Sequence, residues 1–232
     1  MILLTSPGNP TSTLIPLSAV EELLGSPSFK GLVVIDEAYI DFAISSSAND
    51  PVSAASLIDG YPNLVVLQTL SKGFGLAAIR LGLGLASPEL VQILSNTKAP
   101  YNVSAPTAAL ALRALAPESL AGVGSKVQLL VQGRQWLVTT LEELRQQGDL
   151  GNRVGGLDAN FVMFPILKRG TGKPDNVRAE KVYQKMAETE GVVVRFRGRE
   201  IGCEGCLRFT IGTDEENRIC VEKLRKVLEE TD

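Results

Sequence analysis

The first ninety residues contain several short apolar runs, each of which predicts a β-strand. Residues 2–6, 32–35 and 64–69 are β-prone or continuously apolar, and each run ends in turn-forming or polar residues. Continuous apolar runs are typical of parallel strands that are covered on both faces. Residues 81–85 alternate Leu with Gly and predict a further, closely packed strand.

Helical patterns separate these runs and dominate the middle of the chain. Residues 17–24 predict a helix with Ser18 as N-cap and Glu21 at the capping-box position. Segments rich in Ala and Leu predict helices at 104–116 and 118–147, the second interrupted at its glycines. A polar loop is expected at residues 45–53, and no internal repeat is present.

The last third of the chain combines both kinds of pattern. It predicts strands at 161–164, 192–196 and 206–211, and helices at 177–190 and 214–230, the last capped by Asp214. Strands that alternate with helices predict an α/β fold with a mostly parallel sheet, followed by a small α+β C-terminal domain. We expect part of a large domain at residues 1–105, connecting helices at 106–147 and the small domain at 148–232.

Charge and composition exclude several classes of function. The 232 residues carry 23 Lys and Arg against 26 Asp and Glu, for a net charge of −3 and a pI of about 5.3. Such a chain lacks the excess of Lys and Arg that binding to nucleic acid or anionic membranes normally requires. It has no signal-peptide pattern and no apolar run of about 18 residues. We therefore expect a cytoplasmic protein without nucleic-acid or membrane partners.

The complete absence of histidine narrows the possible chemistry. It removes Ser-His-Asp and Cys-His nucleophile pairs and all histidine-containing metal sites. Three cysteines are too few for a secreted disulfide framework, and Cys203 and Cys206 lack a second ligand pair, so we expect structural thiols and no metal site. Trp136 has apolar neighbours at helical spacing and is expected in the core.

Polar side chains follow each of the first three predicted strands. They are Asn9, Asp36, Tyr39, Ser71, Lys72 and Arg80. In an open α/β sheet, ligands bind beyond the carboxyl ends of the strands. Taken singly, each residue has an ordinary interpretation, such as a turn at Asn9, a solvated lysine at position 72 or a surface ion pair at Arg80. Taken together, an amide, a carboxylate, a phenol, an amine and a guanidinium match the needs of pyridoxal phosphate (PLP).

Several longer strings carry a resemblance to a known family. They are residues 6–11 (SPGNPT), 36–42 (DEAYIDF), 69–82 (TLSKGFGLAAIRLG), 98–104 (KAPYNVS), 160–161 (NF) and 207–213 (LRFTIGT). In this order they resemble the fold-type I PLP-dependent aminotransferases. Within that family, they are most similar to the histidinol-phosphate aminotransferases, which exchange an amino group between glutamate and imidazole acetol phosphate.

The resemblance implies a role for each residue that binds the cofactor. Lys72 would form the Schiff base with PLP and then move the proton between the substrate Cα and the cofactor C4′. Asp36 would pair with the pyridinium nitrogen, and Asn9 and Tyr39 would hydrogen-bond the phenolic oxygen of the ring. Ser71 and Arg80 would bind the cofactor phosphate.

The resemblance also implies which residues bind the substrate. Arg208 would hold the substrate carboxylate through its guanidinium fork. Arg195 would meet the substrate phosphate, although Arg197 and Arg199 compete for this role. The implied partners are small, phosphorylated amino-acid and oxo-acid substrates and a second copy of the chain in a homodimer.

The chain departs from the family pattern in two places. Ser12 stands where the family motif Asn-Pro-Thr-Gly has glycine, a residue that adopts positive φ easily. Complete members also carry a long N-terminal portion before this motif, whereas eight residues precede Asn9 here. We therefore expect a truncated enzyme that lacks part of its cofactor-binding site and has impaired activity as an isolated chain.

Three interpretations of function follow. The first is transamination between histidinol phosphate and 2-oxoglutarate in histidine biosynthesis. The second is another fold-type I PLP enzyme, such as threonine-phosphate decarboxylase or an aromatic aminotransferase. The third is a non-catalytic remnant that acts only in assembly with another chain.

Overall fold

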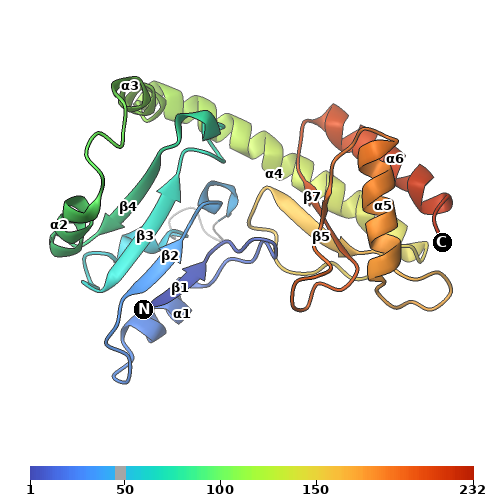
Figure 1. Ribbon diagram of the computed structural model, residues 1–232, viewed down its shortest axis with the longest axis horizontal. Coiled ribbons are helices and arrows are strands. Elements are labelled where there is room, and N and C mark those ends of the chain that lie inside the picture. The colour runs from blue at the N-terminus through green and yellow to red at the C-terminus, as the bar shows by residue number, and fades with distance from the viewer. Residues whose placement is uncertain (45–50) are drawn as a thin grey trace. The chain divides into compact units, whose positions relative to one another are not determined.

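The computed structural model describes residues 1–44 and 51–232 (Figure 1). Residues 45–50, most of the predicted polar loop, lie outside the described residues. The chain divides into two compact units. The first unit contains residues 1–9 and 13–127, and the second contains residues 10–12 and 128–232.

A four-stranded sheet forms the centre of the first unit (Figure 1). Its strands are β1 (Ile2–Thr5), β2 (Val33–Asp36), β3 (Leu64–Thr69) and β4 (Gly82–Ala86), in the order β1-β2-β3-β4. The first three strands are parallel, and β4 pairs antiparallel with β3. All four predicted strands of this region are confirmed, and the sheet is mostly parallel as expected.

One face of this sheet is covered by helix α1 (Leu17–Leu24) and the short helix η2 (Ala54–Leu57). The apolar contacts involve Val20, Leu24, Val33, Ile35, Ala54, Leu64 and Val66, all buried. Helix α1 follows Pro16 and has no side-chain cap, so the predicted capping by Ser18 is wrong. Ser18 already lies inside the helix, because the chain turns into helical geometry directly after Pro16.

The remaining helices of the first unit differ partly from the prediction. Helix α2 (Pro88–Thr97) was not predicted, although Ser87, Pro88 and Glu89 form a recognisable helix start. Helix α3 (Ala105–Ala114) begins as predicted, because the Ser104 side chain accepts a hydrogen bond from the Thr107 amide. Helix α4 (Pro117–Gln146) runs without the predicted interruption. Glycine costs a helix only about 1 kcal/mol, which the flanking turns outweigh.

The second unit is built on a three-stranded antiparallel sheet. Its order is β5 (Phe161–Pro165), β7 (Cys206–Thr210) and β6 (Arg195–Phe196). Helices α5 (Asn176–Glu188) and α6 (Asp214–Glu229) and part of α4 share one apolar core with β5 and β7. Helix α6 is capped by Thr213 in a capping box with Glu216, so the predicted cap at Asp214 is wrong by one residue. Within the described ranges, no helix is long and apolar enough to cross a membrane.

Residues 10–12 belong to the second unit although their neighbours in sequence belong to the first. The amides of Gly156 and Asp158 donate hydrogen bonds to the carbonyls of Thr11 and Ser12, at 2.8 and 2.9 Å. Ser12 is 1% exposed and adopts a φ of 55°, the conformation that favours glycine. Its hydroxyl accepts a hydrogen bond of 2.7 Å from the Ala159 amide. The serine thus provides an acceptor that glycine lacks.

This contact predicts a ranking of two substitutions at position 12. Ser12→Ala keeps the unfavourable φ and leaves the Ala159 amide without its acceptor, which should lower stability by about 2 kcal/mol. Ser12→Gly loses the same acceptor but regains about 1 kcal/mol of backbone strain, so it should cost less. Urea unfolding followed by the fluorescence of Trp136, the single tryptophan, reports on the second unit. A larger loss in Ser12→Gly than in Ser12→Ala would contradict this prediction.

Candidate functional site

The carboxyl ends of the parallel strands align in the first unit. Thr5 lies opposite Asp36 in the register of β1 and β2, and Asp36 lies opposite Leu67 in the register of β2 and β3. Beyond these ends is a cavity of about 310 Å³ lined by Thr5, Pro7, Asn9, Asp36, Ala38 and Tyr39. Three of the predicted site residues, Asn9, Asp36 and Tyr39, therefore line one cavity.

Asp36 is the last residue of β2 and is half-buried. Its Oδ1 atom accepts a hydrogen bond of 3.0 Å from the Ala38 amide, which turns the chain away from the strand. This turn brings Tyr39 to the wall of the same cavity. A carboxylate that faces a small cavity can balance the positive charge of a protonated ring nitrogen.

Lys72 lies on the loop that follows β3. Its Nζ atom is 5.5 Å from the centroid of the Tyr39 ring, so the amine and the phenol are adjacent. Backbone hydrogen bonds close the loop, from the Leu76 amide to the Leu70 carbonyl at 2.9 Å and from the Gly75 amide to the Lys72 carbonyl at 3.0 Å. Gly75 has a φ of 68°, which this tight turn requires.

The two residues predicted to bind the cofactor phosphate do not line the cavity of Asp36. The Ser71 hydroxyl accepts a hydrogen bond of 2.9 Å from the Thr69 hydroxyl at the end of β3. Arg80 is exposed, follows the short helix η3 (Ala77–Ile79) and donates from Nη1 to the Ala77 carbonyl at 3.0 Å. Their role in binding phosphate stays a prediction.

The predicted substrate-binding arginines lie in the second unit. Arg195 of β6 is directly opposite Arg208 of β7, so both side chains leave the same face of the small sheet. The guanidinium carbon of Arg208 is 4.6 Å from the centroid of the Phe161 ring. The two competing arginines are in ion pairs, Arg197 with Glu200 and Arg199 with Glu180.

Glu37 follows Asp36 in the sequence and is a buried acidic residue to which the sequence pattern assigned no role. It is 2% exposed and accepts hydrogen bonds from the Ser53 hydroxyl at 2.6 Å, the Ala54 amide at 2.6 Å and the Gln68 amide group at 2.9 Å. It therefore joins the segment after β2 to β3 and to the start of η2. The sequence signal that could have identified Glu37 is the pair of acidic residues, Asp36 and Glu37, directly after the apolar run at 32–35.

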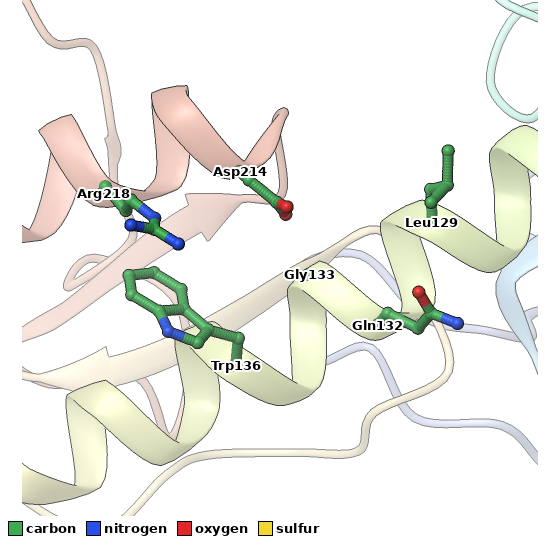
Figure 2. Close-up of a pocket in the computed structure, with 6 residues that line it drawn as sticks. All are labelled: Leu129, Gln132, Gly133, Trp136, Asp214 and Arg218. Atoms are coloured by element: carbon green, nitrogen blue, oxygen red, sulfur yellow. The ribbon is translucent and has the colours of Figure 1, made fainter.

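The second unit holds a separate cavity of about 230 Å³ between α4 and α6 (Figure 2). It is lined by Leu129, Gln132, Gly133, Trp136, Asp214 and Arg218, and the Arg218 side chain points toward the Trp136 ring. Trp136 is 39% exposed, so its predicted place in the core is wrong. Its ring lies between α4 and Arg218 of α6, at the edge of this cavity, and the 3.6-residue pattern alone does not separate such a partly exposed position from the core.

The cysteines of the second unit are free thiols. Cys203 and Cys206 are 2% and 0% exposed and pack against Met163. Burial raises the pKa of Cys206 to about 12 and that of Cys220 to about 11. Such thiols are poor nucleophiles at neutral pH, in agreement with the structural role expected for them.

Known proteins resemble this chain over nearly its whole length. Residues 1–224 match the family model "Aminotransferase class I and II". The histidinol-phosphate aminotransferase of Schizosaccharomyces pombe is 46% identical over 226 residues, which cover 97% of this chain and 57% of that protein. The chain thus spans little more than half the length of the curated relatives that it matches.

Solved structures share the fold. A decarboxylase from Sulfurospirillum multivorans superposes with a TM-score of 0.82 at 26% identity, over 99% of this chain and 56% of its own. A histidinol-phosphate aminotransferase from Sinorhizobium meliloti, solved in complex with pyridoxal-5'-phosphate, has a TM-score of 0.80 at 23% identity, over 98% of this chain and 57% of its own. Together with the match over residues 1–224, these findings establish that the chain belongs to the class I and II aminotransferase family.

Proposed function

We propose that this chain provides the lysine-bearing part of a PLP-dependent aminotransferase that acts on histidinol phosphate and 2-oxoglutarate. The observation that carries the proposal is a single cavity lined by Asn9, Asp36 and Tyr39, with the Lys72 amine 5.5 Å from the Tyr39 ring. The name of the Schizosaccharomyces pombe relative supports the choice of substrate.

The residues at this cavity fit PLP chemically. Asp36 offers a carboxylate for the pyridinium nitrogen, and Asn9 and Tyr39 offer an amide and a phenol for the phenolic oxygen. Lys72 offers a primary amine for covalent attachment. When bound, PLP supplies an electron sink that makes the substrate Cα–H bond acidic. Once the substrate amine has displaced it from the cofactor, the free Lys72 amine would take the proton from the substrate Cα and pass it to C4′.

Three arginines and a serine are proposed to bind the phosphate of the cofactor and the anionic groups of the substrates. Ser71 and Arg80 would hold the cofactor phosphate, with Arg80 as a bidentate donor once it leaves the Ala77 carbonyl. Arg208 would bind the substrate carboxylate and Arg195 the substrate phosphate. The opposed positions of these two arginines on β6 and β7 support a shared site for the anionic groups of the two substrates, the carboxylates of glutamate and the phosphate of histidinol phosphate. The proposed assembly is a homodimer.

Covalent labelling tests the proposed cofactor role. The purified chain is mixed with PLP, the visible absorption band is recorded, and the product is reduced with borohydride and mapped by peptide mass. We expect a band and a label confined to Lys72, because this amine stands beside the proposed cavity. Absence of a band, or a label spread over surface lysines, would refute cofactor binding by this chain.

Substrate comparison tests the narrower proposal. Histidinol phosphate, threonine phosphate and an aromatic amino acid are each offered, under the same conditions, to protein that has been loaded with PLP and not treated with borohydride. We expect histidinol phosphate to give the highest kcat/KM, because the relatives that match this chain at 43–46% identity are named for that substrate. A much higher kcat/KM for the aromatic amino acid would contradict the assignment.

A further inference from the structure

Asp41 and Gly73 lie in close contact in the first unit. A Cβ atom added at Gly73 would lie 2.6 Å from both Cβ and Cγ of Asp41, and in still closer contact with its Oδ2 atom. Real Cβ atoms do not approach other atoms this closely, so only glycine allows the contact.

Asp41 is held on a fixed piece of backbone. It lies in the short helix η1 (Ile40–Phe42), whose N-cap is Tyr39 and whose last residue, Phe42, is 1% exposed. The Ile40 amide donates to the carbonyl of the buried Glu37 at 3.0 Å. Burial raises the pKa of Asp41, and the neighbouring backbone of Gly73 offsets part of that rise. The carboxylate is thus partly removed from water and directed at the Gly73 backbone.

Gly73 immediately follows Lys72. The contact between Asp41 and Gly73 therefore joins the loop that carries Lys72 to the short helix that follows Tyr39. The distance of 5.5 Å between the Lys72 amine and the Tyr39 ring depends on how these two segments are placed. A lysine side chain is flexible, so the position of its backbone limits where the amine can react.

We propose that Asp41 is a positioning residue for Lys72. Its side chain packs against Gly73 and so holds the backbone of Lys72 beside Tyr39 and the proposed PLP cavity. This inference rests on the proposed function, in which Lys72 forms the bond to PLP. The sequence alone does not explain why position 41 is acidic and position 73 is glycine. The close contact between them does.

The rate at which PLP attaches to Lys72 tests this inference. The rate is measured from the visible band, with the product mapped by borohydride reduction and normalised to the folded fraction from circular dichroism. We expect Asp41→Ala to slow attachment about 10-fold, because small misplacements of reacting groups are costly. Asp41→Asn keeps the shape of the side chain that packs against Gly73 and should stay within about 3-fold of the unmodified chain. Asp59→Ala, at an exposed aspartate of the same unit, should leave the rate unchanged.

A double substitution tests the contact itself. Gly73→Ala alone should slow attachment at least as much as Asp41→Ala, because its methyl group meets the Asp41 side chain. In an Asp41→Gly background the same change at Gly73 should add little, since the obstructing side chain is gone. An equal cost of Gly73→Ala in both backgrounds would overturn the inference.

The outcomes separate the inference from the function on which it rests. If the unmodified chain takes no PLP at Lys72, the proposed function fails and the inference fails with it. If the unmodified chain is labelled and Asp41→Ala attaches PLP at the same rate per folded molecule, the inference alone fails. Should Asp41→Ala not fold, slow attachment in folded Gly73→Ala with normal attachment in Asp41→Asn still supports it.

Discussion

Asp36→Ala is expected to weaken the binding of PLP by about 100-fold, which corresponds to about 2.7 kcal/mol. The proposed pair between the Asp36 carboxylate and the pyridinium nitrogen is a charge-assisted hydrogen bond in a partly enclosed cavity. Removing the carboxylate leaves the ring nitrogen without its counter-charge. The measurement is a titration of the visible band with PLP, together with the yield of borohydride-fixed label on Lys72.

Asp36→Asn separates the charge of this residue from its local structural role. Asparagine keeps an acceptor for the Ala38 amide, which now donates to Asp36 Oδ1 at 3.0 Å, but carries no negative charge. We expect Asp36→Asn to weaken PLP binding nearly as much as Asp36→Ala. Binding of PLP to Asp36→Asn with the affinity of the unmodified chain would show that the carboxylate does not pair with the ring.

Arg178→Ala is expected to lower the stability of the second unit by about 4 kcal/mol. The side chain is 1% exposed. Its guanidinium donates to the carbonyls of Leu167, Leu228 and Thr231 at 2.7, 3.0 and 3.0 Å, and to Asp149 at 2.8 Å. Substitution by alanine leaves these buried acceptors without a donor and removes a cation from the carboxyl end of α6. Urea unfolding followed by Trp136 fluorescence measures the change.

Two further substitutions serve as controls for Arg178. Arg178→Lys keeps the charge but cannot reproduce the planar fork, so its loss of stability should fall between those of the unmodified chain and Arg178→Ala. Arg199→Ala removes an exposed ion pair with Glu180 and should cost less than about 1 kcal/mol. A midpoint of urea unfolding in Arg178→Ala equal to that of the unmodified chain would disprove the structural role.

Arg178 also illustrates a limit of sequence reasoning. In the sequence it is one of several charged residues on a helix with a polar composition, which favours a solvated position. Its burial depends on the carbonyls at the end of α6 and after β5, which lie 11 to 53 residues away along the chain. No local pattern contains these partners. The same holds for Glu37, whose donors at Ser53, Ala54 and Gln68 are distant in sequence.

Short apolar or alternating runs were sufficient to predict the strands of both sheets, because burial of one or both faces of a strand leaves a pattern in its own residues. Strand β6 is the exception. The run at 192–196 predicted five residues, but only Arg195–Phe196 pair with β7. At the start of the run, the Val192 amide instead donates to the Met186 carbonyl of α5 at 2.8 Å, so this part of the run closes the preceding helix.

The sequence by itself determined the mostly parallel α/β order, the absence of histidine chemistry, and the polar residues that follow each strand. These are local properties, because they depend only on the spacing of apolar residues and on which residues directly follow each strand. Only the tertiary structure decided that Asn9, Asp36 and Tyr39 line one cavity, that Ser12 tolerates a positive φ through the Ala159 amide, and that Asp41 meets Gly73. Each of these joins segments that are far apart in the chain, and distance in space between such segments is set by packing rather than by neighbours in sequence.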